Sequence, residues 1–427
     1  MPISTIKAAQ EDNTSIDARS AGTMRISVIS SVALIPVSNA TVTISYTGDP
    51  DAPLAVLNTD SSGQTPEIEL ATPPLEYSLN PDTEEQPYSE YNIQVTAEGY
   101  EPILVSGSEV FSGQLTLQPI RMTPLTSPEE EDRVIVIPAH TLFGTYPPKI
   151  PEDEIKPMAE TGEIVLSRVV IPEYVIVHDG VPNDSTAPNY WVRYRDYIKN
   201  VASCEIYSTW PESTIYANIL AIQSFTLNRV YTEWYRNQGY EFTITSSTAY
   251  DQKWVYGRNI YENIDYAVDN IFANYLSRPG VRQPIFTSYC DGNRVTCEGL
   301  SQWGSKYLGD EGYSSIEIIR YYYGNDMYVN TAEAISGVPS SWPGYDLGIG
   351  ASGDKVRQLQ LQLNRISRNY PAIPSLNADG VYGPATSEAV RIFQRIFNLP
   401  QTGITDYATW YEISEIYVGV SRIAEPG

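Results

Sequence analysis

The stretch NVASCEIYSTWPESTIYANILAIQSFTLNRVYTEW, residues 200–234, places a single acid, Glu205, between two helical patterns. Helices are predicted over 191–207 and 212–237, with a Trp-Pro break between them and Gly239 positioned to end the second. The stretch therefore predicts a helical centre for the middle of the chain, and it raises the question of why a charged side chain stands among apolar and aromatic neighbours.

The second helix carries an apolar stripe, which we expect to be core. The stripe consists of Ile215, Ile219, Ile222, Thr226 and Val230. Upstream, YVIVHDG at 174–180 has the pattern of a strand. A strand before two helices indicates a mixed α/β domain, which we place at residues 171–345.

Glu205 is expected at the border of the apolar side of the first helix, near its C-terminal end. There its carboxylate faces the negative pole of the helix, and Tyr207 and Trp210 are positioned to desolvate it. Both effects raise the pKa of a carboxyl group. A glutamic acid kept protonated near neutral pH can donate a proton to a glycosidic oxygen. The alternative is a surface glutamate at a helix end, paired with an arginine.

Residues 24–122 consist of short alternating runs such as MRISVIS and ATVTISYTG, separated by Gly, Pro, Asp and Asn clusters. This pattern predicts a small antiparallel β-sandwich after a short segment at 1–23. The segments NATVTISY and YNIQVTAEGY resemble a transthyretin-like or carboxypeptidase-regulatory-like module. The N-terminus shows no secretory signal pattern, and no apolar run approaches the roughly 18 residues of a membrane span.

The net charge of −25 is concentrated at the front of the chain, since residues 1–165 hold 25 Asp and Glu against 7 Lys and Arg. Nucleic acid is therefore not expected as a partner, because phosphate binding requires basic surface. Residues 123–170 mix acids with prolines, which predicts an extended connection. It is either an interdomain linker or a dedicated site of proteolysis.

Residues 346–427 form the clearest unit. GDKVRQLQLQLNRISRNYP, NADGVYGPATSEAVRIFQRIFNLP and TGITDYATWYEI predict three helices, with Gly380 and Gly383 in tight turns. The expected helical core consists of Val356, Leu359, Leu363, Val390 and Phe393. This region resembles the type 1 peptidoglycan-binding domain over nearly its whole length.

The two histidines, His140 and His178, lie far apart in sequence and outside any metal-ligand spacing, so we expect no metal and no other cofactor. His178 is interpreted as a polar strand-end residue. Cys290 and Cys297 have the spacing of a small disulfide loop or of half a metal site, and the disulfide is favoured. Cys204 is interpreted as a small buried apolar residue, the alternative being a nucleophile paired with His178.

Residues 297–324, CEGLSQWGSKYLGDEGYSSIEIIRYYYG, resemble the closing motif of the stage II sporulation protein D family of lytic transglycosylases. In that family a glutamate precedes Trp-Pro and a helix with an Ala-Gln pattern, as in CEIYSTWPESTIYANILAIQSF. The resemblance implies that Glu205 is the catalytic acid. The implied substrate-binding residues are Trp210, Gln223, Ser301, Gln302 and Trp303. The family's Arg-Thr-Tyr is replaced here by SFTLNRVY.

The order of the parts resembles the clostridial spore cortex-lytic enzymes. That resemblance implies a zymogen made in the mother cell, stored in the spore near the cortex, and activated during germination by a subtilisin-like serine protease that removes the acidic front piece. It also implies cleavage of the bond between N-acetylmuramic acid and N-acetylglucosamine with formation of 1,6-anhydro ends. A two-carboxylate mechanism would need a second acid from among Glu212, Asp291 and Glu298. The rival functions are an N-acetylmuramoyl-L-alanine amidase and a non-catalytic wall-binding spore protein.

Overall fold

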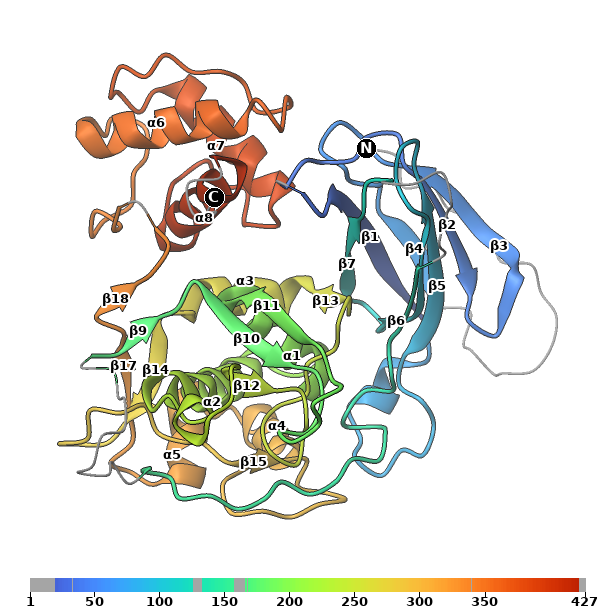
Figure 1. Ribbon diagram of the computed structural model, residues 1–427, viewed down its shortest axis with the longest axis vertical. Helices are drawn as coiled ribbons and strands as arrows, with labels where there is room; N and C mark the ends of the chain where they lie inside the picture. The colour runs from blue at the N-terminus through green and yellow to red at the C-terminus, as the bar shows by residue number, and fades with distance from the viewer. Residues whose placement is uncertain are drawn as a thin grey trace.

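The computed structural model describes residues 20–32, 34–125, 133–156, 166, 168–338 and 340–421. Figure 1 shows a β-rich part, a mixed helical and stranded part, and a C-terminal helical part that lies above the mixed part and beside the β-rich part. The predicted multidomain α+β architecture therefore agrees with the structure, while most of the predicted pre-segment at 1–23 lies outside the described residues.

Two sheets face each other in the β-rich part. The first sheet has the order β13-β7-β1-β4 and the second β3-β2-β5-β6-β8. The strands of the first are β1 (Ala21–Ser30), β4 (Ile68–Ala71), β7 (Leu115–Met122) and β13 (Ile260–Tyr261). Those of the second are β2 (Thr41–Tyr46), β3 (Asp49–Asn58), β5 (Ser89–Thr96), β6 (Ile103–Val110) and β8 (Arg133–Val136). Strict alternation of buried and half-buried residues along β1 matches the side-chain period of a strand packed on one face.

The prediction of an antiparallel sandwich is wrong for two strand pairs. β1 and β7 pair in parallel from Thr23–Leu115 to Ser30–Met122, and β6 and β8 are also parallel. Parallel neighbours require a long crossover connection. Here the chain between β1 and β7 passes through the second sheet and so returns in the original direction.

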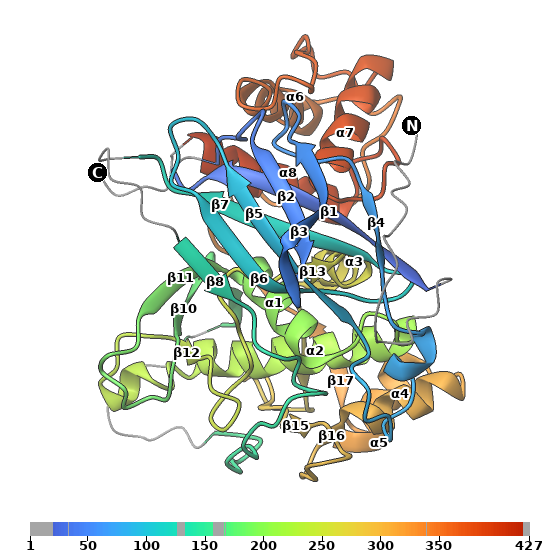
Figure 2. The same ribbon diagram turned by 90° about the vertical axis from the view of Figure 1, so that its right-hand side faces the viewer.

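The predicted boundaries of the sandwich are also too narrow. β8 comes from the predicted connection, and β13 comes from the middle of the chain, where it pairs antiparallel with β7. Because one sheet contains strands from both parts, the sandwich and the mixed part are joined by backbone hydrogen bonds as well as by side chains. Figure 2 shows β13 beside the strands of the sandwich.

The mixed part is built around one long central helix. Its helices are α1 (Tyr194–Glu205), α2 (Glu212–Tyr231), α3 (Glu262–Ile271), α4 (Gln302–Asp310) and α5 (Ser315–Tyr323). Its strands are β9 (Val170–Ile171), β10 (Tyr174–His178), β11 (Asn189–Arg193), β12 (Ile244–Thr245), β14 (Asn274–Ser277), β15 (Tyr289–Cys290), β16 (Leu300–Ser301), β17 (Tyr328–Thr331) and β18 (Ala334–Ile335). α2 is buried on nearly all sides, and several of its buried polar side chains have hydrogen-bond partners, as Asn218 does in Ser305 and Ser224 in the backbone oxygen of Ile285.

The first predicted helix begins later than expected, because residues 189–193 form β11. This strand pairs antiparallel with β10 along its whole length, and cross-strand pairing here overrides the helical pattern. The second predicted helix ends at Tyr231. A 3-10 turn at Arg236–Gln238 follows, and Gly239 closes it with φ of +86°.

The C-terminal part contains the three predicted helices, α6 (Asp354–Ile366), α7 (Pro384–Ile396) and α8 (Tyr407–Ser421). All five predicted core residues are at most 1% exposed. Gly380 has φ of +77°, which favours glycine, whereas Gly383 adopts an extended conformation that other residues accept. Among the residues that the structure describes, no helix is both long and apolar enough to cross a membrane.

Candidate active site

Glu205 is the last residue of α1, and its side chain is only 5% exposed. The helix ends there because Ile206 is extended, and Pro211 then opens α2. Its Oε1 accepts a hydrogen bond of 2.9 Å from the backbone N–H of Lys253. The carboxyl group is thus held at the C-terminal end of a buried helix, as predicted.

Gln302 brings the second predicted motif to the same place. Its Nε2 donates to the backbone oxygen of Glu205 at 2.9 Å and to Oε2 of the same residue at 3.3 Å. Gln302 is the first residue of α4, and the Ser301 hydroxyl caps that helix by accepting from the backbone N–H of Gly304 at 2.9 Å. Residues 97 positions apart therefore form one constellation, in which Gln302 fixes both the backbone and the carboxyl group of Glu205.

Both residues line a cleft of about 210 Å³. The same cleft is also lined by Thr141, Tyr146, Lys149, Asp291 and Arg294. They come from two segments, the chain that follows β8 and the loop that joins β15 to β16. A buried carboxyl group in a concave, polar-lined site is a candidate for proton transfer.

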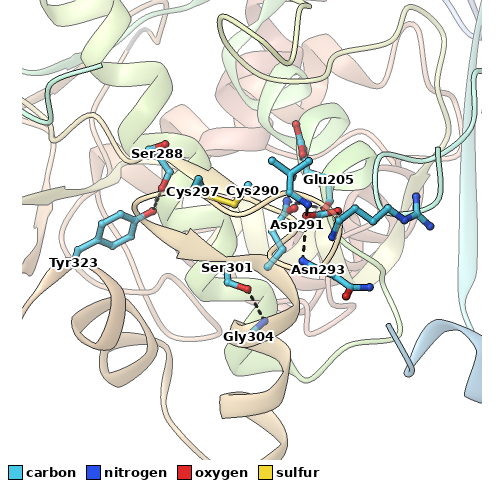
Figure 3. Close-up of a disulfide and its surroundings, with 12 residues drawn as sticks. Glu205, Ser288, Cys290, Asp291, Asn293, Cys297, Ser301, Gly304 and Tyr323 are labelled. Atoms are coloured by element: carbon cyan, nitrogen blue, oxygen red, sulfur yellow. Dashed lines mark hydrogen bonds between the residues drawn. A yellow bond between two sulfur atoms is a disulfide. The ribbon is translucent and has the colours of Figure 1, made fainter. Parts of the chain in front are cut away.

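The loop on one side of the cleft is closed by a disulfide between Cys290 and Cys297. Inside the loop, Oδ1 of Asp291 accepts from the backbone N–H groups of Asn293 and Val295, at 3.2 and 2.8 Å. Figure 3 shows this disulfide loop with Asp291 beside Glu205. The sulfur atoms of Cys290 and Cys297 are therefore bonded to each other, and neither is a free thiolate that could bind a metal.

Among the three acids proposed as a second carboxylate, only Asp291 lines the cleft. Its Oδ2 accepts from the backbone N–H of Arg294 at 3.2 Å, so both oxygens hold the loop. Glu212 and Glu298 are exposed. The arrangement thus offers one carboxyl group for chemistry, that of Glu205.

Residues 137–156, here called the strap, form the opposite wall of the cleft. The strap is anchored at its far end, where Gln283 exchanges two hydrogen bonds of 3.1 Å with the backbone of Lys156. Arg229, which is buried, binds Glu152 through two hydrogen bonds of 2.8 and 2.6 Å. In both Figures 1 and 2 the strap runs past β15. The described part of the predicted connection is extended, as expected, but it is docked on the mixed part.

Lys149 of the strap points its ammonium group into the cleft wall. Its Nζ lies 4.8 Å from the ring centroids of both Phe225 and Tyr289 and donates to the backbone oxygen of Asp251. Burial lowers the pKa of Lys149 to about 8, although the negative charges of Glu205 and Asp251 oppose that shift. The strap therefore brings a cation to the site of the buried acid.

Of the five predicted substrate-binding residues, Gln302 lines the cleft, Ser301 caps α4, and the other three serve packing. Trp210 is 3% and Trp303 9% exposed, their ring centroids are 4.9 Å apart, and the Trp210 indole donates to Ser78 in the sandwich. Gln223 is fully buried in α2. In the orientation that satisfies both of its polar atoms, its amide donates to the backbone oxygens of Ile271 and Asn274, each at 3.2 Å. These three side chains are thus buried by packing in this structure, and their binding of substrate stays a prediction.

The histidines and the free cysteine are also engaged in structural contacts. His178 Nδ1 lies 2.8 Å from Oδ1 of Asn189, and its ring stacks on Phe242 at 4.5 Å. Burial raises the pKa of the Cys204 thiol to about 12, which disfavours the thiolate of a nucleophile. The interpretations of His178 as a strand-end residue and of Cys204 as a buried apolar residue agree with this geometry.

Sequence reasoning missed Lys149, Arg294 and the role of the Lys253 backbone. The Tyr-Pro-Pro-Lys run before Ile150 has the composition of a linker and does not by itself indicate a cleft residue. The one feature of Lys149 that the sequence shows is its positive charge within a strongly acidic segment. No local pattern marks Lys253, because its contribution is a backbone N–H group.

Comparison with known protein families matches residues 352–413 to the family described as "Putative peptidoglycan binding domain". The match covers α6 and α7 and reaches into α8. The protein therefore carries a peptidoglycan-binding domain in its C-terminal part.

A zinc D-Ala-D-Ala carboxypeptidase of Streptomyces albus G is 39% identical over 77 residues, which are 18% of this chain. The match spans only 28% of the length of that relative. The TIE protein of Bacillus anthracis aligns with 25% of this chain and 17% of its own at 14% identity and a TM-score of 0.18. The minor pilin GBS52 of Streptococcus agalactiae aligns with 27% of this chain and 49% of its own at the same identity and TM-score. TM-scores this low carry no argument about fold or function.

Proposed function

We propose that the protein is a lytic transglycosylase that cleaves peptidoglycan between N-acetylmuramic acid and N-acetylglucosamine. The observation that carries the proposal is the buried Glu205 carboxyl group, held by Gln302 and by the Lys253 N–H in a cleft of a protein with a peptidoglycan-binding domain. It is supported by the resemblance of both motifs to the stage II sporulation protein D family.

In the proposed reaction Glu205 first gives its proton to the glycosidic oxygen as the bond from that oxygen to C1 of the muramic acid breaks. The resulting carboxylate then takes the proton of the 6-hydroxyl group as O6 bonds to C1. The product is a 1,6-anhydro end, and Glu205 is protonated again. One carboxyl group suffices because the nucleophile belongs to the same sugar and is already close to C1.

We also propose that the intact chain is a zymogen of the spore cortex, cut in the connection at 123–170 by a subtilisin-like serine protease. The position of the strap supports this proposal, because its residues form one wall of the cleft that Glu205 also lines. The peptidoglycan-binding part is neutral in charge, so it can supply attachment that an acidic enzyme does not gain from an anionic wall.

The test uses full-length chain with a specific protease site inserted within residues 157–165. After nicking, the chain is expected to lower the turbidity of decoated spores and to release fragments with anhydro-muramic ends. Glu205→Gln should abolish release while cosedimentation with cortex is unchanged. Glu212→Gln, which removes an exposed carboxylate nearby in sequence, serves as the matched control and should retain activity. Full activity of Glu205→Gln would remove that residue from the mechanism.

A second candidate is a wall-binding protein without catalysis, because the family match covers only the binding domain. In that case nicked chain binds cortex and releases nothing. An amidase, the other rival, would release peptides and leave the glycan strands without new sugar ends.

A further inference from the structure

We infer that Arg294 forms a subsite for the peptide oxygens of the stem carried by the muramic acid, and this inference rests on the proposed function. The observation is a contact inside the cleft. Nη1 of Arg294 donates to the backbone oxygens of Phe143 at 2.5 Å and Gly144 at 2.9 Å, both in the strap. A guanidinium group of the cleft therefore already binds two successive peptide carbonyl groups, which belong to a turn of the strap.

Arg294 is presented by a loop that is held in place independently of the strap. The Cys290–Cys297 disulfide closes the loop, and Asp291 accepts from the backbone N–H groups of Asn293, Arg294 and Val295. The Asn293 side chain also donates to the backbone oxygen of Pro81 at 2.8 Å. Because these contacts do not involve strap residues, the loop and its arginine are expected to remain when the strap leaves.

The guanidinium group has unused binding capacity. Arg294 is exposed, and within the described ranges no carboxylate lies within 4.0 Å of it, so its partners there are two neutral carbonyl groups. Its planar donor fork can bind carbonyl oxygens and binds carboxylate oxygens more strongly. Lys149, the other cation that lines the cleft in the described part of the chain, belongs to the strap and would be displaced together with it. Arg294 is then the cation that stays on the cleft wall.

The contacts of Arg294 with the strap indicate which part of the substrate would bind this arginine. The strap places peptide carbonyls on Arg294 while it lines the cleft that contains Glu205. In the proposed substrate, the group beside the scissile bond that offers peptide carbonyls and a free carboxylate is the stem. We therefore assign the stem to the place that Phe143 and Gly144 hold in the intact chain.

The first test compares nicked wild-type chain with Arg294→Gln on stem-bearing glycan strands and on strands whose peptides have been removed. We expect the variant to raise the apparent KM for stem-bearing strands roughly tenfold, with kcat nearly unchanged and peptide-free strands unaffected. Arg282→Gln removes the same charge from an exposed position away from the cleft and should behave as wild type on both. Equal loss on both substrates, or no loss on either, would overturn the inference.

The second test does not depend on cleavage. In a nicked Glu205→Gln chain, binding of a disaccharide-tetrapeptide is measured with and without Arg294→Gln, and weaker binding by about tenfold is expected. Arg294→Lys, which keeps the charge but not the fork, should lie between the two. Unchanged affinity refutes the subsite even if glycan cleavage is established, while a clear difference supports the subsite even if the proposed chemistry fails.

Discussion

At the scale of single residues, this fold buries several charged groups and gives each of them a defined set of partners. Arg258 and Glu109 are each about 1% exposed, and their side chains form hydrogen bonds of 2.5 and 3.3 Å. Arg258 also donates to the backbone oxygen of Ser203 at 2.7 Å, two residues before Glu205. A residue of the sandwich therefore helps to fix the end of the helix that carries the proposed acid.

Glu109→Gln is expected to destabilise the protein by about 3–5 kcal/mol, because it leaves the Arg258 charge buried without its counter-charge. Unfolding in urea measures the loss. Glu388→Gln breaks the exposed pair with Arg391 on α7 and should change stability by less than about 0.5 kcal/mol. Similar losses in the two variants would show that burial does not control the strength of the pair.

Gln302 and Gln223 give a matched pair of buried amides with different expected roles. Gln302→Leu removes the side-chain donor to Glu205, so it should lower kcat about a hundredfold and also cost about 1–3 kcal/mol of stability. Gln223→Leu should cost about 1–3 kcal/mol of stability and leave kcat near the wild-type value, because its partners are backbone oxygens outside the cleft. Activity assays and thermal unfolding of both variants check the assignment, and a kcat loss confined to Gln223→Leu would reverse it.

At the scale of elements, α8 is attached to the mixed part through a buried ionic cluster. Arg195 of α1 contacts Glu412 at 2.6 Å and Asp269 of α3 at 3.1 Å, and it also binds Glu415. Burial raises the pKa of Glu412 to about 7. Burial acts on Glu415 too, but Arg195 and Arg193 hold its pKa at about 2. Glu412 and Glu415 lie one helical turn apart, yet the folded protein favours the protonated form of Glu412 and the ionised form of Glu415.

We expect opposite effects of neutralising these two acids at pH 8. The pKa of Glu412 is higher in the folded than in the unfolded chain, so its contribution to stability is lost as the pH rises from about 4.5 to 7. Glu412→Gln should remove that pH dependence and be neutral or stabilising at pH 8. Glu415→Gln should destabilise, because the charged form contributes stability above about pH 4.5 that is lost as the pH falls towards 2.

Denaturation at pH 5 and pH 8 provides the measurement for both variants. Each substitution places an amide of nearly equal size on the same helix, so differences in packing are small. A larger loss for Glu412→Gln than for Glu415→Gln at pH 8 would contradict the expected order.

At the scale of the whole molecule, the acidic front part is integrated into the rest of the protein. β7 pairs with β13, the Glu109 backbone exchanges hydrogen bonds of 3.1 Å with the Asn259 side chain, and Phe111 of the sandwich packs on Tyr207 at 5.1 Å. The strap has contacts of its own with the mixed part, among them the hydrogen bonds of Glu152 with Arg229 and of Lys156 with Gln283. We therefore expect the sandwich to stay bound after cleavage of the connection, whereas displacement of the strap requires that its own contacts break.

A chain nicked within residues 157–165 should elute as one species of unchanged size in gel filtration, and its two fragments should separate only in denaturant. The physical reason is the shared sheet and the buried Glu109–Arg258 pair, which hold the fragments without a covalent link. Spontaneous separation at micromolar concentration would instead support release of the whole front piece. The uncut chain is the control for size.

Local periodicity determined much of this protein. The three C-terminal helices, the alternation in β1 and the core stripe of α2 depend on neighbours one to four positions away, so they could be predicted from the sequence. The sequence also indicated Glu205 and Gln302, through two short motifs. The parallel pairing of β1 with β7 and the late start of α1 could not be predicted, since both depend on strand partners distant in the sequence or on competition between pairing and helix formation.

Only the tertiary structure decided what surrounds Glu205. The Lys253 N–H, the strap with Lys149, and Arg294 reach the cleft from positions 48 or more residues away, and no spacing rule connects them. The same holds for Trp210 and Gln223, whose residue types suit either a binding surface or a core, and whose burial assigns them to the core. Sequence encodes the periods of helices and strands, whereas a cleft is made by contacts between segments that only the folded chain brings together.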